Sequence, residues 1–380
     1  MLLSKSMDLL QDKIIYLDYN ATTPIEPRVI EEIVNTLDEF GNPSSAHYFG
    51  KRAKEIIELA RIKVSNLIGA KPEEIIFTSG ATEANNLAIL GRALCFEKGH
   101  IITSSIEHPS VLNPCKHLMR MGYEVTFLPV DSKGLVDPSD VKRAIRRDTL
   151  LVTIMHSNNE TGVIQPIAEI GETLLEQGIP LHTDCAQSIG KVSVSVKDLK
   201  ATMISLAGHK SYAPKGIGAL YLKEGFILKP ILFGASQERG FRPGTENIPH
   251  IAGFGKACEI IREEFNQIVN HLKEVTDLLL EKLLTIEGLR LNGEGAPRLP
   301  NTLNVSIKNI MADEFVERVG DRLAISAGSA CHAGVRNISH VLVAMGLKDF
   351  ALSSIRLSTG KFTTTEEVIH AVEIIKESIN

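Results

Sequence analysis

A lysine and an aspartate in this chain each follow a short apolar run that is typical of a buried strand. Lys210 comes just after the run at residues 203–206, and Asp184 follows the run at residues 179–183. An amine and a carboxylate at two strand ends suit a site for pyridoxal phosphate. There the lysine would carry the aldehyde as a Schiff base and the carboxylate would keep the pyridine nitrogen protonated. The alternative for this pair is a surface lysine and a helix-capping aspartate.

Three further strand ends carry small or polar residues that could take part in such a site. Segment 78–86 predicts a strand end, a small-residue turn and a helix start, which could hold an anion or be an ordinary turn. His108 could stack on a flat aromatic cofactor and relay protons, or be a hydrogen-bonded polar residue without a role. Asn158 and Asn159 could orient a ring substituent or a substrate carboxylate, or form an Asx-turn.

Two residues in the C-terminal third could also take part in the chemistry of the site. Arg356 stands in a short apolar strand, where an unpaired guanidinium is costly, so it should meet either a structural acid or a substrate carboxylate. Cys331 lies in a run of small residues that supplies no apolar wall, so its thiol should be available to react. His332 and His340 do not complete a four-ligand site with this cysteine, and we expect no metal.

The elements that must position these residues alternate along the chain. Short apolar runs separated by longer segments of helical period favour a mostly parallel sheet with helices on both faces. In such sheets ligands bind beyond the carboxyl ends of the strands, where the residues above are expected. The predicted strands are residues 75–78, 100–104, 123–129, 150–155, 179–183, 202–206 and 218–222.

The C-terminal part of the sequence predicts a second, smaller unit. A long helical segment at 252–286 is expected to cross from one domain to another, and shorter helices and strands follow it. Residues 363–366 have the spacing of a capping box before a last helix. We expect a large domain at residues 16–265, and a small domain at 1–15 and 266–380 that carries Cys331 and Arg356.

Size and composition agree with a two-domain protein that acts on a small molecule. The chain has 380 residues, and its net charge of −5 gives no reason to expect nucleic acid or an acidic membrane as partner. No apolar run is long enough to span a bilayer, and residues 1–13 lack the apolar core of a secretory signal. Five scattered cysteines without a CxxC pair argue against a disulfide framework. We therefore expect a cytoplasmic protein.

Eight segments together resemble the NifS/IscS-type cysteine desulfurases, which are class V relatives within the fold-type I pyridoxal phosphate enzymes. The similarity runs in order from about residue 15 to residue 373. Selenocysteine lyases share much the same motifs. The segments are residues 16–24, 41–45, 78–86, 158–162, 182–187, 208–210, 242–245 and 328–331.

The resemblance implies a role for each residue at the cofactor ring. Lys210 would be the Schiff-base lysine and Asp184 the partner of the pyridinium nitrogen. Gln187 would bond the phenolate oxygen of the ring, and His108 would stack on the ring face. Asn159 would orient both cofactor and substrate.

The resemblance also implies how the phosphate and the second subunit are arranged. Ala81, Thr82 and His209 would hold the phosphate, joined by Thr245 from the other subunit of a homodimer. Members of the family commonly have a serine where this chain has Ala207. The substitution removes one hydroxyl from the phosphate site and should weaken retention of the cofactor.

The implied reaction converts L-cysteine to L-alanine. Arg356 would hold the substrate carboxylate, and Cys331 would accept the sulfur as a persulfide for delivery to an acceptor or scaffold protein. That delivery would supply iron–sulfur cluster assembly or tRNA thiolation. After Cys331 the chain departs from the usual family sequence, which leaves the acceptor open.

Three other functions are compatible with parts of the pattern. A selenocysteine lyase would use the same residues with L-selenocysteine as substrate. A class V aminotransferase would leave Cys331 without a role. A non-catalytic scaffold for sulfur-assembly proteins would not need Lys210 and Asp184.

Overall fold

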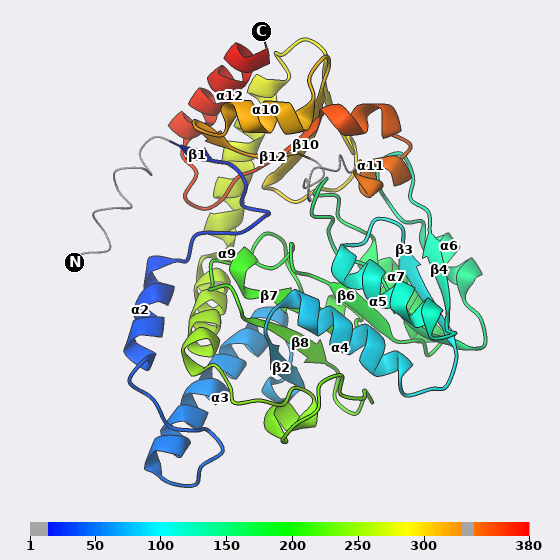
Figure 1. Ribbon diagram of the computed structural model, residues 1–380, viewed down its shortest axis with the longest axis vertical. Coiled ribbons are helices and arrows are strands. Elements are labelled where there is room, and N and C mark those ends of the chain that lie inside the picture. Colours follow the sequence, from blue (N-terminus) through cyan, green and yellow to red (C-terminus); the bar gives the residue numbers. More distant parts are fainter. Residues whose placement is uncertain (1–13, 328–337, 380) are drawn as a thin grey trace.

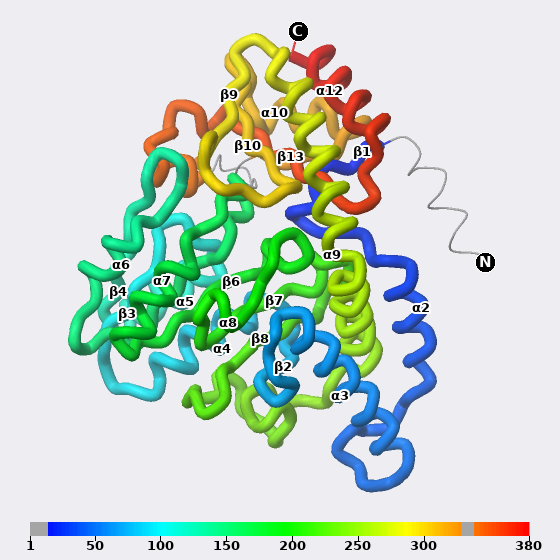
Figure 2. Tube along the Cα trace, turned by 180° about the vertical axis from the view of Figure 1, so that it is seen from behind, coloured from blue at the N-terminus to red at the C-terminus, as the bar shows by residue number. Residues whose placement is uncertain are grey.

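The computed structural model describes residues 14–327 and 338–379. Figure 1 shows a large lower part, in which helices flank a central sheet, and a smaller upper part of helices and strands. The long helix α9 (Ile248–Leu283) runs through both parts, and Figure 2 shows it from behind beside α2 (Pro27–Thr36) and α3 (Tyr48–Ile68). No helix in these described ranges is long and apolar enough to cross a membrane.

The central sheet has seven strands in the order β2-β8-β7-β6-β5-β3-β4. The neighbours from β7 to β4 are parallel, whereas β8 runs antiparallel to both β7 and β2. The predicted mostly parallel sheet is confirmed, and each predicted strand ends within two residues of an observed one. The strands are β2 (Ile75–Thr78), β3 (His100–Ser104), β4 (Glu124–Leu128), β5 (Thr149–Thr153), β6 (Leu181–Asp184), β7 (Met203–Ala207) and β8 (Gly218–Leu222).

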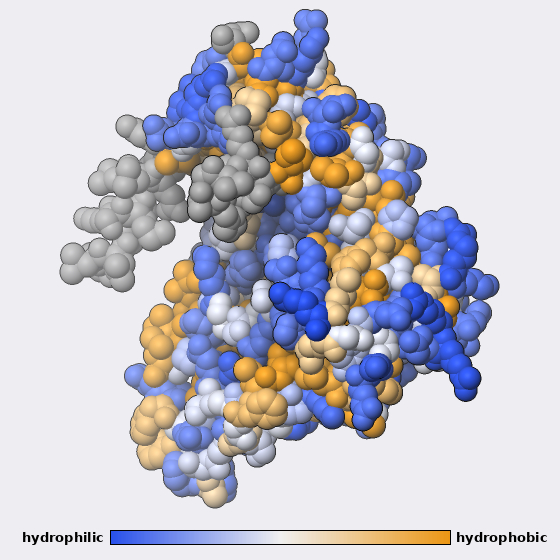
Figure 3. Space-filling view, turned by 45° about the vertical axis from the view of Figure 1, so that its right-hand side comes forward, coloured by the Kyte–Doolittle hydropathy of each residue, from blue (hydrophilic) through white to orange (hydrophobic). Residues whose placement is uncertain are grey.

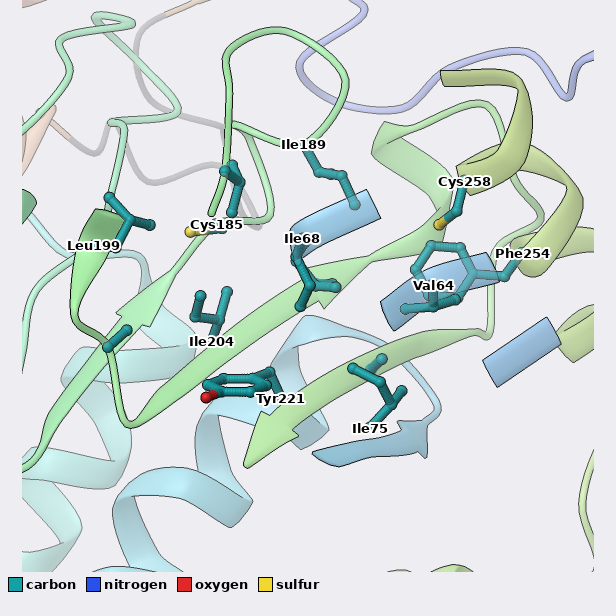
Figure 4. Close-up of a cluster of buried hydrophobic side chains, with 14 of the residues drawn as sticks. Val64, Ile68, Ile75, Cys185, Ile189, Leu199, Ile204, Tyr221, Phe254 and Cys258 are labelled. Carbon is teal, nitrogen blue, oxygen red and sulfur yellow. The ribbon is translucent and has the colours of Figure 1, made fainter. Parts of the chain in front are cut away.

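Alternate side chains of these strands enter different cores. Ile75 and Tyr221 point to the core formed with α3 and α9, which Figure 4 shows with Val64, Ile68 and Phe254. Their neighbours in the strands belong instead to the core formed with α4 (Ala81–Ala93) and α5 (Pro109–Arg120). This period of two, with apolar residues on both faces, is what a sheet covered by helices on both sides requires.

The smaller part is built on a four-stranded antiparallel sheet in the order β12-β13-β10-β9, beside a parallel pair of β1 and β11. Its own buried cluster combines these strands with the second half of α9 and with the last helix. The bounds are β1 (Ile15–Tyr16), β9 (Leu289–Leu291), β10 (Thr302–Ile307), β11 (Leu323–Ala324), β12 (Ser326–Ala327), β13 (Ser354–Ser358), α10 (Ala312–Val319), α11 (His340–Ala344) and α12 (Thr365–Ile379).

Short helices complete the chain. They are α6 (Pro138–Ala144), α7 (Ile167–Glu176), α8 (Val196–Leu199), η1 (Pro72–Glu74), η2 (Gly208–Lys210), η3 (Gln237–Gly240) and η4 (Lys348–Ser353).

Helix α9 links the two buried clusters. Phe254 and Cys258 of its first half lie in the core of the large sheet, and Leu279 of its second half lies in the core of the small one. At Gly255 an added Cβ would be 2.7 Å from the Cα of Ala60, so a glycine is needed for α9 to approach α3. The domain boundary at residue 266 stays a prediction.

Candidate active site

A cavity of about 610 Å³ opens beyond the carboxyl ends of β6 and β7. The parallel strands of the sheet bring residues that are far apart in sequence to this one edge. Eight of the residues predicted from the sequence line the cavity together. They are Ala81, Thr82, His108, Asn159, Asp184, Gln187, His209 and Lys210.

Lys210 reaches the cavity from the single turn η2, which directly follows β7. Its Nζ donates a hydrogen bond of 2.6 Å to the backbone oxygen of Asn20. Burial lowers the pKa of Lys210 to about 8, and the positive charge of Arg356 acts in the same direction. Because a larger share of such a lysine is unprotonated near neutral pH, its amine is well suited to attack an aldehyde.

Asp184 ends β6, and both of its carboxylate oxygens are held in place. Oδ1 accepts from the backbone N–H of Ala186 at 2.9 Å, and Oδ2 accepts from Nδ2 of Asn85 at 2.7 Å. The same Nδ2 donates to the hydroxyl of Ser110, which lies 2.7 Å from Nδ1 of His108. A hydrogen-bonded chain therefore fixes the carboxylate relative to the imidazole.

His108 is both a wall of the cavity and the N-cap of α5. Its Nδ1 accepts from the backbone N–H of Ser110 at 3.1 Å, so the neutral ring carries its proton on Nε2. Desolvation lowers the pKa of His108 from its ordinary value, with Lys210 and His340 adding to the effect and Asp184 opposing it. The imidazole is thus favoured in its neutral form, which is suited to stacking on a ring.

The start of helix α4 makes part of the cavity wall suited to an anion. Helix α4 begins there at Ala81, and its N-cap residue Gly80 provides no side-chain hydrogen bond, so N–H groups of the first turn are left for a ligand. Gly218 has no room for a side chain, because an added Cβ would lie 2.7 Å from the Cα of Gly80. Ala207 also lines this cavity and is 1% exposed.

His209 completes the polar wall of the cavity. Its Nδ1 lies 3.3 Å from the hydroxyl of Thr22. Burial, together with the charges of Lys210, Lys215 and Lys191, lowers the pKa of His209 to about 4. The ring is therefore neutral at pH 7 and acts through a hydrogen bond.

The two adjacent asparagines, Asn158 and Asn159, have different roles in the structure. Asn158 forms the Asx-turn, since its Oδ1 accepts from the backbone N–H groups of Glu160 and Thr161 at 2.9 Å. Asn159 lines the cavity, and its backbone oxygen accepts from Nη1 of Arg356 at 3.0 Å.

Arg356 lies beside the cavity but is not among the residues that line it. The strand β13 carries it, and its Nη2 pairs with Oδ1 of Asp18 at 2.6 Å. The structural acid expected as one alternative is therefore present. Its Nε is buried and has no partner within the described part of the chain, so the guanidinium still has a donor to offer.

Two predicted residues are not placed at this cavity. Thr245 is exposed on the loop before α9 and is not one of the lining residues. Cys331, with His332, lies outside the described residues. His340 instead bonds the backbone oxygen of Glu107 at 3.0 Å, and no group of three His, Cys, Asp or Glu among residues 14–327 and 338–379 could hold a metal.

Sequence reasoning missed three polar residues of the site. Asn85 bonds Asp184, Asn20 accepts from Lys210, and Lys191 bonds both Asn20 and Gln187. Asn85 lies inside segment 78–86 and Asn20 inside segment 16–24, so both could have been found there. Lys191 lies in the turn after β6, outside the segments singled out in the sequence, and carries no such local signal.

The donor set fits pyridoxal phosphate. An amine with a lowered pKa, a fixed carboxylate, a helix N-terminus without a side-chain cap and a neutral imidazole all line the cavity. These are the groups that bind an aldehyde, a pyridinium nitrogen, a phosphate and a ring face.

Comparison with known proteins agrees with this reading of the cavity. Residues 15–370 match the aminotransferase class-V family, and the chain belongs to that family. Membership implies the use of pyridoxal phosphate.

Individual relatives are more specific. A curated protein of Pectobacterium carotovorum subsp. carotovorum (strain PC1), called cysteine desulfurase IscS, is 45% identical over 96% of this chain and 92% of its own. A solved structure of a NifS-like protein is 36% identical, with a TM-score of 0.90 over 96% of this chain and 98% of its own. A structure of SspA in complex with cysteine is 41% identical, with a TM-score of 0.82 over 92% of this chain and 99% of its own.

Proposed function

We propose that this chain is a cysteine desulfurase that takes sulfur from free L-cysteine and releases L-alanine. The observation that carries the proposal is the amine of Lys210, with a pKa lowered to about 8, beside the fixed carboxylate of Asp184 in the cavity. The 45% identity to a curated cysteine desulfurase IscS supports the choice of substrate.

Pyridoxal phosphate, when bound, would supply an acceptor for the electrons left at the substrate Cα after its proton is removed. Lys210 would hold the cofactor aldehyde, and Asp184 would face the ring nitrogen and keep it cationic. Nζ of Lys210 would also be the base that takes the proton from the substrate Cα. Ala81, Thr82 and His209 would bind the phosphate, His108 would stack on the ring, and Gln187 would donate to its phenolate oxygen.

Arg356 is the proposed site for the substrate carboxylate. Its Nε, which has no hydrogen-bond partner among the described residues, and its bond to the backbone oxygen of Asn159 at the cavity wall support this role. A planar guanidinium can bind a carboxylate through two parallel hydrogen bonds, which orients the substrate as well as holding it. Asp18 keeps the guanidinium charge paired when no substrate is present.

Cys331 is the proposed sulfur acceptor. Its thiolate would attack the sulfur of the bound cysteine, so that the carbon–sulfur bond breaks and a sulfur–sulfur bond forms. The carbon takes the electron pair and a proton to become the methyl group of alanine. The persulfide holds the transferred sulfur for an acceptor protein, and no external reductant is needed.

A homodimer is proposed as the working form, with Thr245 completing the site of the other subunit. Thr245 is exposed away from the cavity of its own subunit. Exposed apolar side chains of α2, of the segment after it and of the start of α3 support an interface; they include Val34, Phe40 and Tyr48, which are 57%, 77% and 69% exposed. Figure 3 shows apolar residues gathered at the lower left, where Figure 1 places these elements. Surfaces of this kind commonly mark protein contacts.

The cytoplasmic location expected from the sequence stays a prediction.

Mass spectrometry after incubation with substrate tests the function. With L-cysteine, we expect alanine in solution and one added sulfur atom on Cys331. The Cys331→Ser variant should bind the cofactor, gain no sulfur at position 331 and stop turnover. Selenium added from L-selenocysteine, with no sulfur added from L-cysteine, would identify a selenocysteine lyase instead.

A further inference from the structure

Lys191 is a buried lysine that the proposed reaction does not use. It is 4% exposed and lies in the turn after β6, seven residues beyond Asp184 in the chain. Among the described residues its Nζ bonds neutral acceptors alone, namely Oε1 of Gln187 at 2.9 Å and Oδ1 of Asn20 at 3.2 Å. An ammonium group is rarely buried without a carboxylate, so this placement calls for a reason.

The surroundings of Lys191 favour its uncharged form. Burial lowers its pKa well below the ordinary value, and the positive charges of Lys210 and Arg356 lower it further. The third titratable group near it, His209, is neutral at pH 7. An uncharged amine has two N–H donors, and the two acceptors just described match them.

Two hydrogen bonds, one of them from Lys191, fix the amide of Gln187. Its Oε1 accepts from Lys191, and its Nε2 donates at 2.9 Å to the backbone oxygen of Asn20, which also accepts from Lys210. Both ends of the amide are therefore held. Because Gln187 lines the cavity, the second N–H of Nε2 is left for a ligand there.

We propose that Lys191 is a positioning residue of the cofactor site, which clamps Gln187 and Asn20 so that Gln187 presents an N–H to the phenolate oxygen of bound pyridoxal phosphate. The inference rests on the proposed function for the identity of the cofactor. The same clamp holds Asn20, whose backbone oxygen positions Nζ of Lys210.

The clamp predicts a change in the colour of the bound cofactor with pH. An N–H donor stabilises the anionic phenolate oxygen and so lowers the pH midpoint of the visible absorbance. In Lys191→Met the amide of Gln187 is free to turn, and the midpoint should rise by about one pH unit, the size expected for one hydrogen bond to a charged group. Lys197→Met is the matched control, because it removes an exposed lysine of α8 and should leave the midpoint unchanged.

A double variant separates the clamp from a simple effect of charge. Gln187→Leu should raise the midpoint as Lys191→Met does, and the two together should raise it no further, since both changes remove the same donor. Additive shifts would mean that Lys191 acts without Gln187. An unchanged midpoint in Lys191→Met with a lowered melting temperature would reduce Lys191 to a structural role, and would overturn the proposal.

Measurements on the cofactor-free protein complete the test. The pKa of Lys191 is lower in the folded than in the unfolded chain, so the unfolded state binds more protons and the stabilising effect of Lys191 increases as pH rises. The melting temperature of the cofactor-free wild type, relative to that of Lys191→Met, should therefore rise between about pH 7 and pH 10. If Lys191→Met does not fold, Lys191→Gln, which keeps an N–H donor, replaces it and should shift the midpoint less.

The two proposals can fail separately. A protein that makes alanine from cysteine but shows no shift in these variants keeps its proposed function and loses the clamp. A protein that binds pyridoxal phosphate with the predicted shift but makes no alanine keeps the clamp and loses the function.

Discussion

At the scale of single residues, the site depends on groups whose ordinary charge is changed by burial. Burial lowers the pKa values of Lys210, Lys191 and His209, and neighbouring positive charges lower them further. A buried base close to positive charges is less basic than it would be in water. The amine that must attack an aldehyde is therefore available near neutral pH.

The lowered pKa of Lys210 predicts how cofactor loading depends on pH. Only the unprotonated amine attacks the aldehyde, so the rate at which cofactor-free protein takes up pyridoxal phosphate should rise with a midpoint near pH 8. Stopped-flow absorbance measures this rate, and Lys210→Ala should give no visible band. A midpoint near pH 10 would show that the lysine is not desolvated.

Replacing Ala207 by serine should strengthen the binding of the cofactor through its phosphate. A serine at this buried position would add one hydroxyl to the cavity wall with little change in volume. One hydrogen bond to a charged phosphate should slow dissociation of the cofactor about tenfold. Ala207→Gly, which adds no donor, is the control, and equal dissociation rates for Ala207→Ser and wild type would refute the expectation.

At the scale of elements, the sequence is informative where the structure is regular and buried. The strand β2 and the strand β8 begin and end at the predicted residues, because uninterrupted apolar runs between turns mark strands covered on both sides. The expected helix at 252–286 begins earlier, at Ile248, because Asn247 caps it and Pro249 suits its first turn. The last capping box lies at Thr364 and Glu367, one residue after the prediction.

Contacts between distant segments were beyond the reach of local patterns. Asn20 meets Lys210 across 190 positions, and Arg356 meets Asp18 across 338. Each pair depends on how β13 and the N-terminal segment lie against the sheet, which no window of sequence reports. The residue types at strand ends predicted the contents of the cavity, and packing decided how they are bonded.

The position of Arg356 on the strand β13 allows us to predict the effect of changing this residue. Its register with β10 pairs Arg356 with Asn304 and sets the guanidinium next to Asp18 and Asn159. Arg356→Lys keeps the charge but loses the planar pair of donors, so KM for L-cysteine should rise about tenfold or more with a smaller fall in kcat. Steady-state kinetics measure both, and an unchanged KM would leave Arg356 as a structural partner of Asp18.

At the scale of the whole molecule, the residues that line the cavity and those bonded to its wall come from several parts of the chain. Lys210 and Asp184 come from the large sheet, Arg356 comes from the small one, and Asn20 comes from the N-terminal segment that joins them. Small shifts between the two sheets would therefore change both the binding of the substrate and the position of the amine. This arrangement suits a site that must open and close around a small molecule.

The proposed homodimer can be tested by mixing two variants that are each inactive or impaired alone. If Thr245 serves the site of the other subunit, a mixture of Lys210→Ala and Thr245→Ala chains should form hybrid dimers in which one site has both native residues. Activity should then exceed that of either variant alone, because each parent dimer lacks one of these residues at both sites. Refolding the two chains together and separating hybrids by an affinity tag allows this measurement. If Thr245 serves its own subunit, every site in the hybrid lacks one residue and mixing restores nothing.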